Sequence, residues 1–191
     1  MSFMLLGILN SQAAGGGGAA YELLESVALS TSASSVTFSG LGAYSDYKHL
    51  QIRAVVRSDS TNSGVQYLGY RFNGDSTSGN YADHKLRGTG SIVQSEGNSG
   101  SRSFSLIDEQ VPGGSSTSNV FGAFVMDIQD FSSSSKYKTS RILGGAIVSA
   151  DTDITLSSGL YLSTSAVSSI NLFRDTDNLV AGSRFSLYGV K

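Results

Sequence analysis

The chain has 191 residues, of which 39% are hydrophobic, enough for one domain with a sizeable buried core. Charged residues make up only 15%, against roughly a quarter in ordinary soluble domains. The net charge of -2 provides no basic field to hold a nucleic-acid backbone. The absence of cysteine excludes disulfides, thiolate metal sites and thiol nucleophiles. Ser, Thr, Asn and Gly must therefore cover most of the surface, as in many secreted, adhesive and virion proteins.

The first twenty residues combine an apolar stretch with four glycines at 15–18. No Lys or Arg precedes Lys48, so the positive region of an export signal is missing. The apolar stretch is also far shorter than the roughly 20 residues of a spanning helix. We therefore expect residues 1–20 to form an arm and glycine linker, with the arm buried against a partner subunit; a frayed or self-packed tail is the alternative. The expected contact residues are Phe3, Leu5, Leu6, Ile8 and Leu9.

From Tyr21 to Lys191 the hydrophobic pattern has the period of β-strands. The clearest segment is 49–57, where Leu50, Ile52, Ala54 and Val56 alternate with mostly polar residues. Segments 21–29 and 35–40 resemble a hairpin joined by "STSAS", and "NGD" at 73–75 predicts a tight turn. Helical periodicity is missing, apart from a turn or two near 4–14. The further expected strands are 65–72, 81–88, 101–107, 119–131, 140–150, 153–163, 168–174 and 183–191.

About ten short alternating strands separated by Ser/Gly/Asn clusters indicate an antiparallel sandwich or barrel over residues 21–191. Two of these strands, 119–131 and 140–150, carry apolar residues on both faces. In the first, Phe124 and Phe121 lie on opposite faces, and in the second Gly144 and Gly145 thin the middle. Either the second face is covered by loops of the same chain, or it meets a neighbouring subunit in a symmetric oligomer. On the second interpretation Phe121 is a partner contact.

Several stretches, in this order, cover nearly the whole chain: "LLGILNSQAAGGGGAAYELLESVAL", "SSVTFSGL", "YSDYKHLQIRAVVRS", "YRFNGD" with "NYADHKLRGTG", "NVFGAFVMDIQDF" running into "KYKTSRILGG", and "LVAGSRFSLYGVK". In these stretches the chain resembles a family of virion proteins of tailed bacteriophages that infect aquatic bacteria. The resemblance implies a virion component with a jelly-roll-like β-sandwich and an extended N-terminal arm. No catalytic motif defines that family, and its location on the head or the tail stays open.

Catalytic and metal-binding patterns are weak. His84 follows Asp83, and His49 opens a strand, but no nucleophile elbow accompanies either histidine. The acidic stretches "DTD" at 151–153 and "DTDN" at 175–178 lack the spacing of a calcium loop and predict turns instead. We therefore expect no enzyme activity, no metal and no cofactor.

Tyrosines are frequent enough to suggest a sugar-stacking platform, although each is also a good strand former. The tyrosines in question are Tyr44, Tyr47, Tyr67, Tyr70 and Tyr81.

Two functions from different classes stay open. The first is a virion structural protein: a capsid decoration or cement subunit, or a head or tail appendage, that binds other virion proteins through its arm. We expect it to form a homo-oligomer, by preference a trimer, with no nucleic acid or membrane partner. The second is a receptor-binding module that recognises host surface carbohydrate. The short four-glycine tether favours the first, because a receptor fibre usually has a long stalk.

Overall fold

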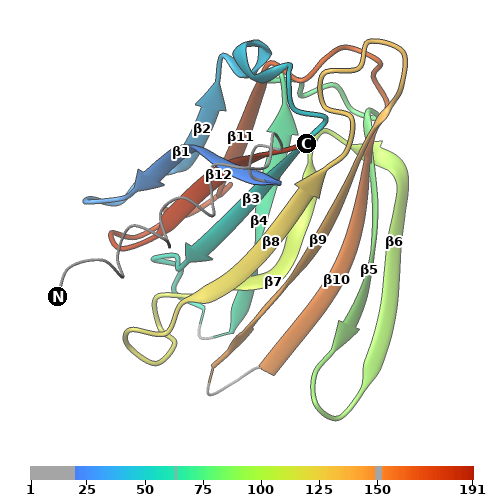
Figure 1. The fold of residues 1–191 in the computed structure, drawn as a ribbon. Helices are drawn as coiled ribbons and strands as arrows, with labels where there is room; N and C mark the ends of the chain where they lie inside the picture. The colour runs from blue at the N-terminus through green and yellow to red at the C-terminus, as the bar shows by residue number, and fades with distance from the viewer. Residues whose placement is uncertain (1–19, 63, 149–151) are drawn as a thin grey trace, which may run out of the picture.

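The computed structural model describes residues 20–62, 64–148 and 152–191. Within these residues the chain forms twelve strands and one short 3-10 helix, Leu41–Tyr44 (Figure 1). The strands are β1 Tyr21–Ala28, β2 Ser35–Ser39, β3 His49–Val56, β4 Val65–Phe72, β5 Tyr81–Gly88, β6 Val93–Arg102, β7 Ser105–Pro112, β8 Gly122–Ile128, β9 Lys138–Ile147, β10 Thr152–Tyr161, β11 Ser169–Phe173 and β12 Arg184–Val190.

The strands form two antiparallel sheets that pack into a β-sandwich. The larger sheet has the order β1-β12-β3-β8-β9-β10-β5-β6, and the smaller has the order β2-β11-β4-β7. If the two hairpins β5-β6 and β9-β10 are set aside, eight strands remain. In chain order these eight pair as first-eighth-third-sixth in one sheet and second-seventh-fourth-fifth in the other. This is the double Greek key of a jelly roll, so the prediction of an all-β, jelly-roll-like sandwich is confirmed.

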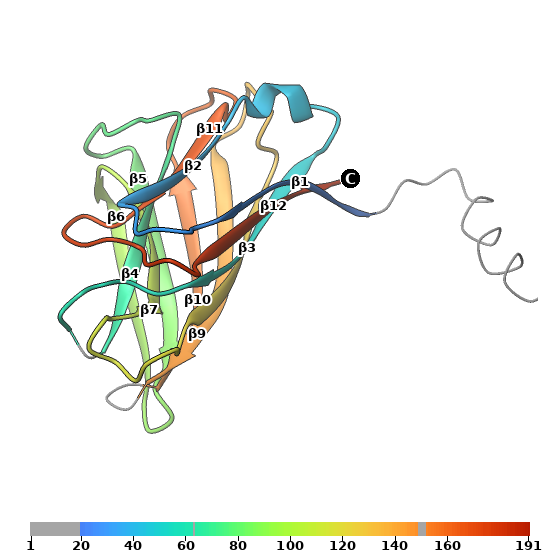
Figure 2. The same cartoon turned by 90° about the vertical axis from the view of Figure 1, so that its left-hand side faces the viewer.

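The two hairpins widen only one of the sheets. The β9-β10 hairpin follows β8 and the β5-β6 hairpin follows β4, and β10 pairs with β5 from Ile154↔Gly88 to Tyr161↔Tyr81. The larger sheet therefore extends beyond the smaller one, with β10, β5 and β6 at the right of Figure 1. Figure 2 views the molecule from the opposite edge, where β1 and β2 lie. The outermost strand β6 is exposed along most of its length, because the smaller sheet does not reach under it. The widened sheet provides the broad outer face described below.

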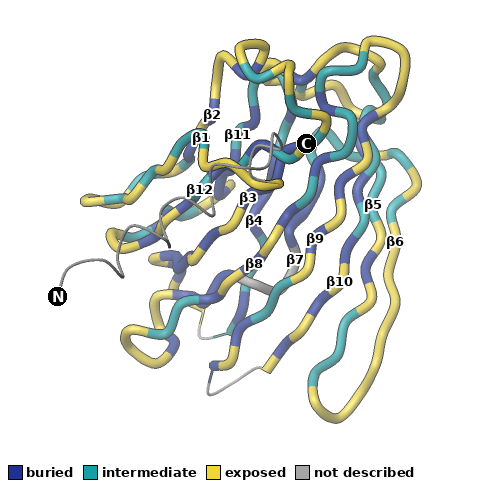
Figure 3. The backbone as a smooth tube through the Cα atoms, in the orientation of Figure 1, coloured by how far each residue is buried: buried dark blue, intermediate teal, exposed yellow. Residues whose placement is uncertain are grey.

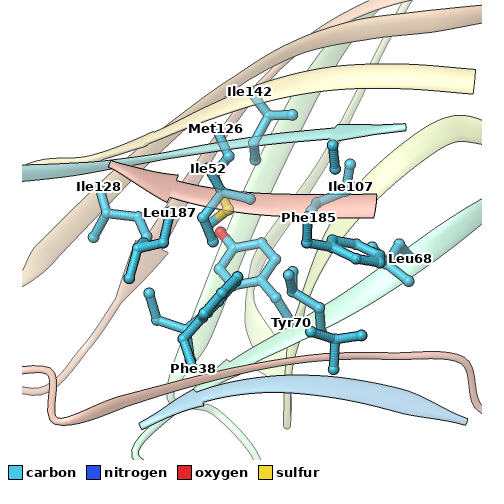
Figure 4. Packing of buried hydrophobic residues seen from close by; sticks show 14 of the residues in the cluster. Phe38, Ile52, Leu68, Tyr70, Ile107, Met126, Ile128, Ile142, Phe185 and Leu187 are labelled. Carbon is cyan, nitrogen blue, oxygen red and sulfur yellow. The ribbon is translucent and has the colours of Figure 1, made fainter. Parts of the chain in front are cut away.

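The hydrophobic core lies between the two sheets (Figure 4). Strand β3 buries Leu50, Ile52, Ala54 and Val56, as its alternation predicts. Strand β8 buries Phe124 in the same layer. Each fully buried large apolar side chain contributes about 1.5–3 kcal/mol to stability. The core side chains that Figure 4 labels are Phe38, Ile52, Leu68, Tyr70, Ile107, Met126, Ile128, Ile142, Phe185 and Leu187.

The predicted hairpin between 21–29 and 35–40 is wrong. Strand β1 pairs with β12, with Tyr21 opposite Val190, and β2 pairs with β11 in the other sheet. The turn-like residues between the two segments instead carry the chain across the sandwich. The "NGD" turn is confirmed, since Asn73 and Gly74 both have positive φ and the Asp75 amide donates to the Phe72 carbonyl. The helical turns expected near 4–14 lie outside the described residues.

Candidate functional site

A row of exposed apolar side chains crosses the outer face of the larger sheet. Figure 3 shows how buried and exposed residues alternate along the strands of this sheet. Val125 on β8 lies opposite Leu143 on β9, which lies opposite Leu156 on β10, which lies opposite Leu86 on β5. Their side chains are 37%, 53%, 52% and 50% exposed, respectively. Because strands are about 4.8 Å apart, the row is roughly 14 Å long. The sequence left open whether loops of the same chain cover the second apolar face of 119–131 and 140–150. Among the described residues, no loop covers these exposed side chains.

Beside this row lies a second one in which two small residues lie between exposed apolar ones. Val55 lies opposite Ala123, and Ala123 lies opposite Gly145, which lies opposite Ile154. A Cβ atom on Gly145 would overlap the Asp153 carbonyl of β10, so only glycine fits where these two strands approach each other. Ala123 has only a methyl group and Gly145 has no side chain. The sheet surface is therefore hollow between the larger side chains that flank them.

Two adjoining hollows result, one on each side of Leu143. The first has a volume of about 510 Å³ and the second about 380 Å³. Exposed Ile147 and Ile154, 72% and 62% exposed, stand at the rim of the first. The first hollow is lined chiefly by Phe121, Ala123, Leu143, Gly145, Ile147 and Ile154. The second is lined chiefly by Arg53, Val55, Ala123, Val125, Leu143 and Arg184.

Arg57 holds the loop that carries Phe121 to this face. Its guanidinium is buried at 8% exposure and donates to four backbone carbonyls of the loop, at 2.8, 2.8, 3.0 and 2.9 Å. Alternation predicted an outward, solvated Arg57, because a pattern of period two does not reveal that a later loop covers the strand end. The four acceptors are the carbonyl oxygens of Thr117, Val120, Gly114 and Ser116.

A polar row borders the apolar rows on the same face. It runs from Asp127 through Arg141 and Ser158 to His84 across β8, β9, β10 and β5. The Gln51 amide donates to Asp127 Oδ1 at 2.8 Å and extends the row onto β3. The face therefore has an apolar middle and a polar border, the usual anatomy of a protein–protein interface.

Beyond the polar border lies a third hollow, of about 530 Å³. Gly97, Gly159 and Ala82 contribute little or no side chain to its lining, and His84 is exposed beside it. Hydroxyl, amide and imidazole groups contribute to the lining beside apolar ones. The chief lining residues are Ala82, His84, Asn98, Thr139, Ser158 and Leu160.

The two histidines are not part of a catalytic arrangement. His84 is exposed on the outer face, whereas the Asp83 side chain is only 9% exposed and lies 3.8 Å from Arg102 Nε. Adjacent residues of a strand point to opposite faces, so the imagined Asp-His pair does not form. His49 Nδ1 accepts a hydrogen bond from the Asp130 amide at 3.0 Å. Its contact is therefore with the backbone that follows β8.

The acidic residues of 151–153 and 175–178 that the structure describes form ion pairs and hydrogen bonds within the chain. Asp153 lies within β10 rather than in a turn, and its buried carboxylate pairs with Arg87 at 2.6 and 3.0 Å. Asp177 pairs in the same bidentate way with Arg174, and Asp175 accepts a hydrogen bond from Tyr67. Asp151 lies outside the described residues. Among the described residues, no three metal-ligating side chains of His, Asp or Glu come together.

The five tyrosines proposed as a sugar platform are not gathered at one surface. Tyr70 and Tyr81 are buried at 1% and 0% exposure, and burial raises the pKa of the Tyr70 hydroxyl to about 12. Tyr44 and Tyr47 pack against the edge of the core. Tyr67 lies apart from them on β4, with the guanidinium of Arg174 5.1 Å from its ring centre. A shared stacking platform of these residues is therefore wrong.

The predicted partner-contact residues fall into two groups. Phe3, Leu5, Leu6, Ile8 and Leu9 lie outside the described residues, so the structure does not place them. Phe121 is half-buried just before β8, lines the first hollow, and lies against Gly182. Sequence reasoning missed Leu86, Ile154 and Leu156, whose exposed side chains join the surface only because β10 and β5 lie next to β9. The described part of the chain contains no helix with the length and hydropathy of a membrane span.

No family model and no curated protein matches the chain. Among solved structures, the chain is similar to one titled as the binding domain of botulinum neurotoxin DC in complex with SialylT. The sequence identity is 10% and the TM-score is 0.30. The match covers 89% of this chain and 40% of that chain, so this chain spans less than half of the matched one. A likeness at this level assigns neither a fold nor a ligand to the chain.

Proposed function

We propose that this chain is a structural subunit of a bacteriophage particle, either a capsid decoration or cement protein or a head or tail appendage, that works by assembly rather than by catalysis. The observation that carries the proposal is the exposed apolar middle of the larger sheet's outer face. Four large side chains in register across four strands are 37–53% exposed there. Contiguous apolar patches of this kind mark interaction surfaces in soluble proteins.

Assembly of identical copies is favoured by the chemistry of this face. Its apolar middle suits another apolar surface, and its polar border contains one acidic and one basic residue, Asp127 and Arg141. The chain itself has a net charge of only -2, so copies repel one another weakly. Closed symmetric homo-oligomers are the commonest soluble assemblies. The proposal therefore includes a small homo-oligomer, with a trimer as the expected form.

Copy number in purified virus particles tests the virion part of the proposal. Gel densitometry should find the chain in particles whose genome encodes it, at hundreds of copies for a shell decoration and at a few to some tens for a tail or vertex appendage. Particles that lack the protein altogether would contradict the virion assignment.

A receptor-binding module for host carbohydrate is the second candidate. It is favoured by the polar hollow of about 530 Å³, whose hydroxyl, amide and imidazole groups suit a hydroxyl-rich ligand. A glycan array probed with the intact protein tests this candidate. Binding that Ser158→Leu abolishes and Thr37→Leu, on the other sheet, leaves unchanged would support it; no binding to any glycan would leave assembly as the function.

A further inference from the structure

We propose that the two apolar hollows beside Leu143 receive the apolar segment 3–9 of a neighbouring copy of this chain. The inference deepens the proposed function, because it requires the outer face to be an assembly surface and names what fills it. The segment inserts its large side chains into the hollows, and the glycine run 15–18 links it to the body of its own copy.

The first support is chemical complementarity. Segment 3–9 has six large apolar side chains, and no charged residue precedes Glu22. The two hollows present apolar walls at Phe121, Leu143 and Ile147. The charged groups that line the hollows are the arginines at the edge of the second and Asp153 in the first, whose buried carboxylate is paired with Arg87. The contact would remove both apolar surfaces from water.

The second support is the shape of the outer face. Leu143 separates two hollows of about 510 and 380 Å³, and their floors are low because Ala123 and Gly145 carry little or no side chain. Two separate hollows, one on either side of the protruding Leu143, fit individual side chains of a short segment. Leu143 and Ile147 are 53% and 72% exposed. A flat sheet from a second copy would contact these two side chains and leave the hollows empty.

The third support is the direction in which the chain enters the sheet. Tyr21 starts β1 at the end of the sheet where β12 and β3 bring Val190 opposite His49. The hollows lie at the other end, where Val55 faces Ala123. Backward continuation of β1 therefore leads away from the hollows of the same copy. A neighbouring copy placed beyond that end offers its own hollows to the segment.

The chain length outside the sheet allows this exchange. The path from Tyr21 to the first hollow of the same copy crosses four strand spacings and about six residues of strand, or roughly 28 Å, and requires a reversal at the start. Residues 10–20 span at most ~36–40 Å. This length suffices for the same copy as well as for an adjacent molecule beyond the sheet edge, and the direction of β1 favours the adjacent molecule.

Cysteine trapping tests the proposal cleanly, because the chain contains no native cysteine. Full-length Leu6→Cys is mixed with full-length Ala123→Cys, which places a thiol on the floor shared by both hollows. The two proteins carry tags of different mass and are oxidised together. The matched control replaces Ala123→Cys with Thr37→Cys, an exposed position on the smaller sheet. We expect the mixed disulfide with Ala123→Cys to form at least fivefold more than the control, and Leu143→Asp in the Ala123→Cys chain to reduce it to the control level.

Three results would overturn the proposal. Equal trapping at the two positions would mean that segment 3–9 does not dock in the hollows. An internal disulfide in the Leu6→Cys/Ala123→Cys double variant, without mixed disulfides between chains, would place the segment on its own copy. Efficient Ala123→Cys homodimers would show that two sheet faces pack directly. The first and third results leave assembly through the outer face intact, whereas the second would fill that face with the segment of the same copy. A full-length chain that stays monomeric would refute the homo-oligomer of the proposed function, and virus particles without the protein would refute the virion assignment.

Discussion

Gly159 lies where β10 passes closest to the Tyr70 hydroxyl in the interior. A Cβ atom there would overlap this hydroxyl and lie 2.7 Å from Ser140 Oγ, which is hydrogen-bonded to the same hydroxyl at 2.5 Å. Backbone and buried ring cannot both move aside in a close-packed interior. We expect Gly159→Ala to lower the free energy of unfolding by about 1–3 kcal/mol in urea titrations. Gly42→Ala, with no atom within 4 Å of the added carbon, is the control and should stay within about 0.5 kcal/mol of the wild type.

Arg57 acts on the outer face through a loop rather than through a direct contact. Its replacement by Met removes the donors of four hydrogen bonds to the loop 114–120. We expect Arg57→Met to cost about 2 kcal/mol or more, because the buried carbonyls lose charge-assisted partners. Hydrogen exchange should accelerate in the amides of 113–121. Arg57→Lys keeps the charge but loses the several N–H donors of the guanidinium, so its stability and exchange rates should lie between those of the wild type and Arg57→Met. Unchanged hydrogen exchange in the loop of Arg57→Met would contradict this role.

Asp75 gives the fold an acid-sensitive contact. Its carboxylate accepts hydrogen bonds from the Thr77 amide at 2.8 Å, Asn80 Nδ2 at 2.8 Å and the Tyr161 hydroxyl at 2.9 Å. These bonds, the Thr77 amide first, lower the pKa of Asp75 from 3.8 to about 2. A carboxyl group with a depressed pKa in the folded state stabilises the fold above its unfolded pKa, and loses that effect as the pH falls through the folded value.

The matching measurement compares wild type with Asp75→Asn in urea between pH 6 and pH 2. The wild type should be the more stable protein at pH 6, and the difference should shrink as the pH falls from about 4 to 2. Asp59 and Asp130, whose pKa values are also lowered, contribute equally to both proteins and cancel in the difference. A difference that does not change with pH would show that the Asp75 charge plays no part.

At the scale of strands, successive residues of β8 point alternately into the core and onto the interaction surface. Phe124 is 3% exposed and Val125 is 37% exposed, on opposite faces of the same strand. We expect Phe124→Asp to yield an insoluble or unfolded protein, since an unpaired buried charge costs several kcal/mol. Val125→Asp should keep the circular dichroism spectrum and melting temperature of a folded β protein. A Val125→Asp chain that unfolds like Phe124→Asp would contradict the exposed position of this face.

The same strands show what local sequence can predict. Alternation assigned Phe124 to one face and Val125 to the other, because a side-chain period of two is a property of each strand alone. Pairing partners are not local: β1 meets β12, with partners 156 to 169 residues apart, so proximity in sequence suggested a false hairpin. Strand β6 was not predicted, since Val93 is the one large apolar residue in "VQSEGNSGSR" and the pairing to β5 comes from the hairpin.

At the scale of the whole molecule, the jelly roll could be anticipated more completely than the surface it carries. Phe121 and the outward residues of 119–131 and 140–150 were predicted as an interface from two doubly apolar strands. Ile154 and Leu156 have the pattern of ordinary strand residues, and only the order β9-β10-β5 brings Leu156 opposite Leu143 and Ile154 opposite Gly145. An interaction surface on a sheet is thus a property of strand order and register, which a single sequence does not state directly.

Sedimentation velocity of the full-length protein tests assembly through the outer face most directly. The wild type should sediment as a homo-oligomer whose population rises with concentration, while Leu143→Asp should sediment as a folded monomer at the same concentrations. Thr37→Asp, equally exposed but on the smaller sheet, should behave as the wild type. A wild type that remains monomeric up to high concentration, or a Leu143→Asp variant that associates as strongly as the wild type, would contradict the claim.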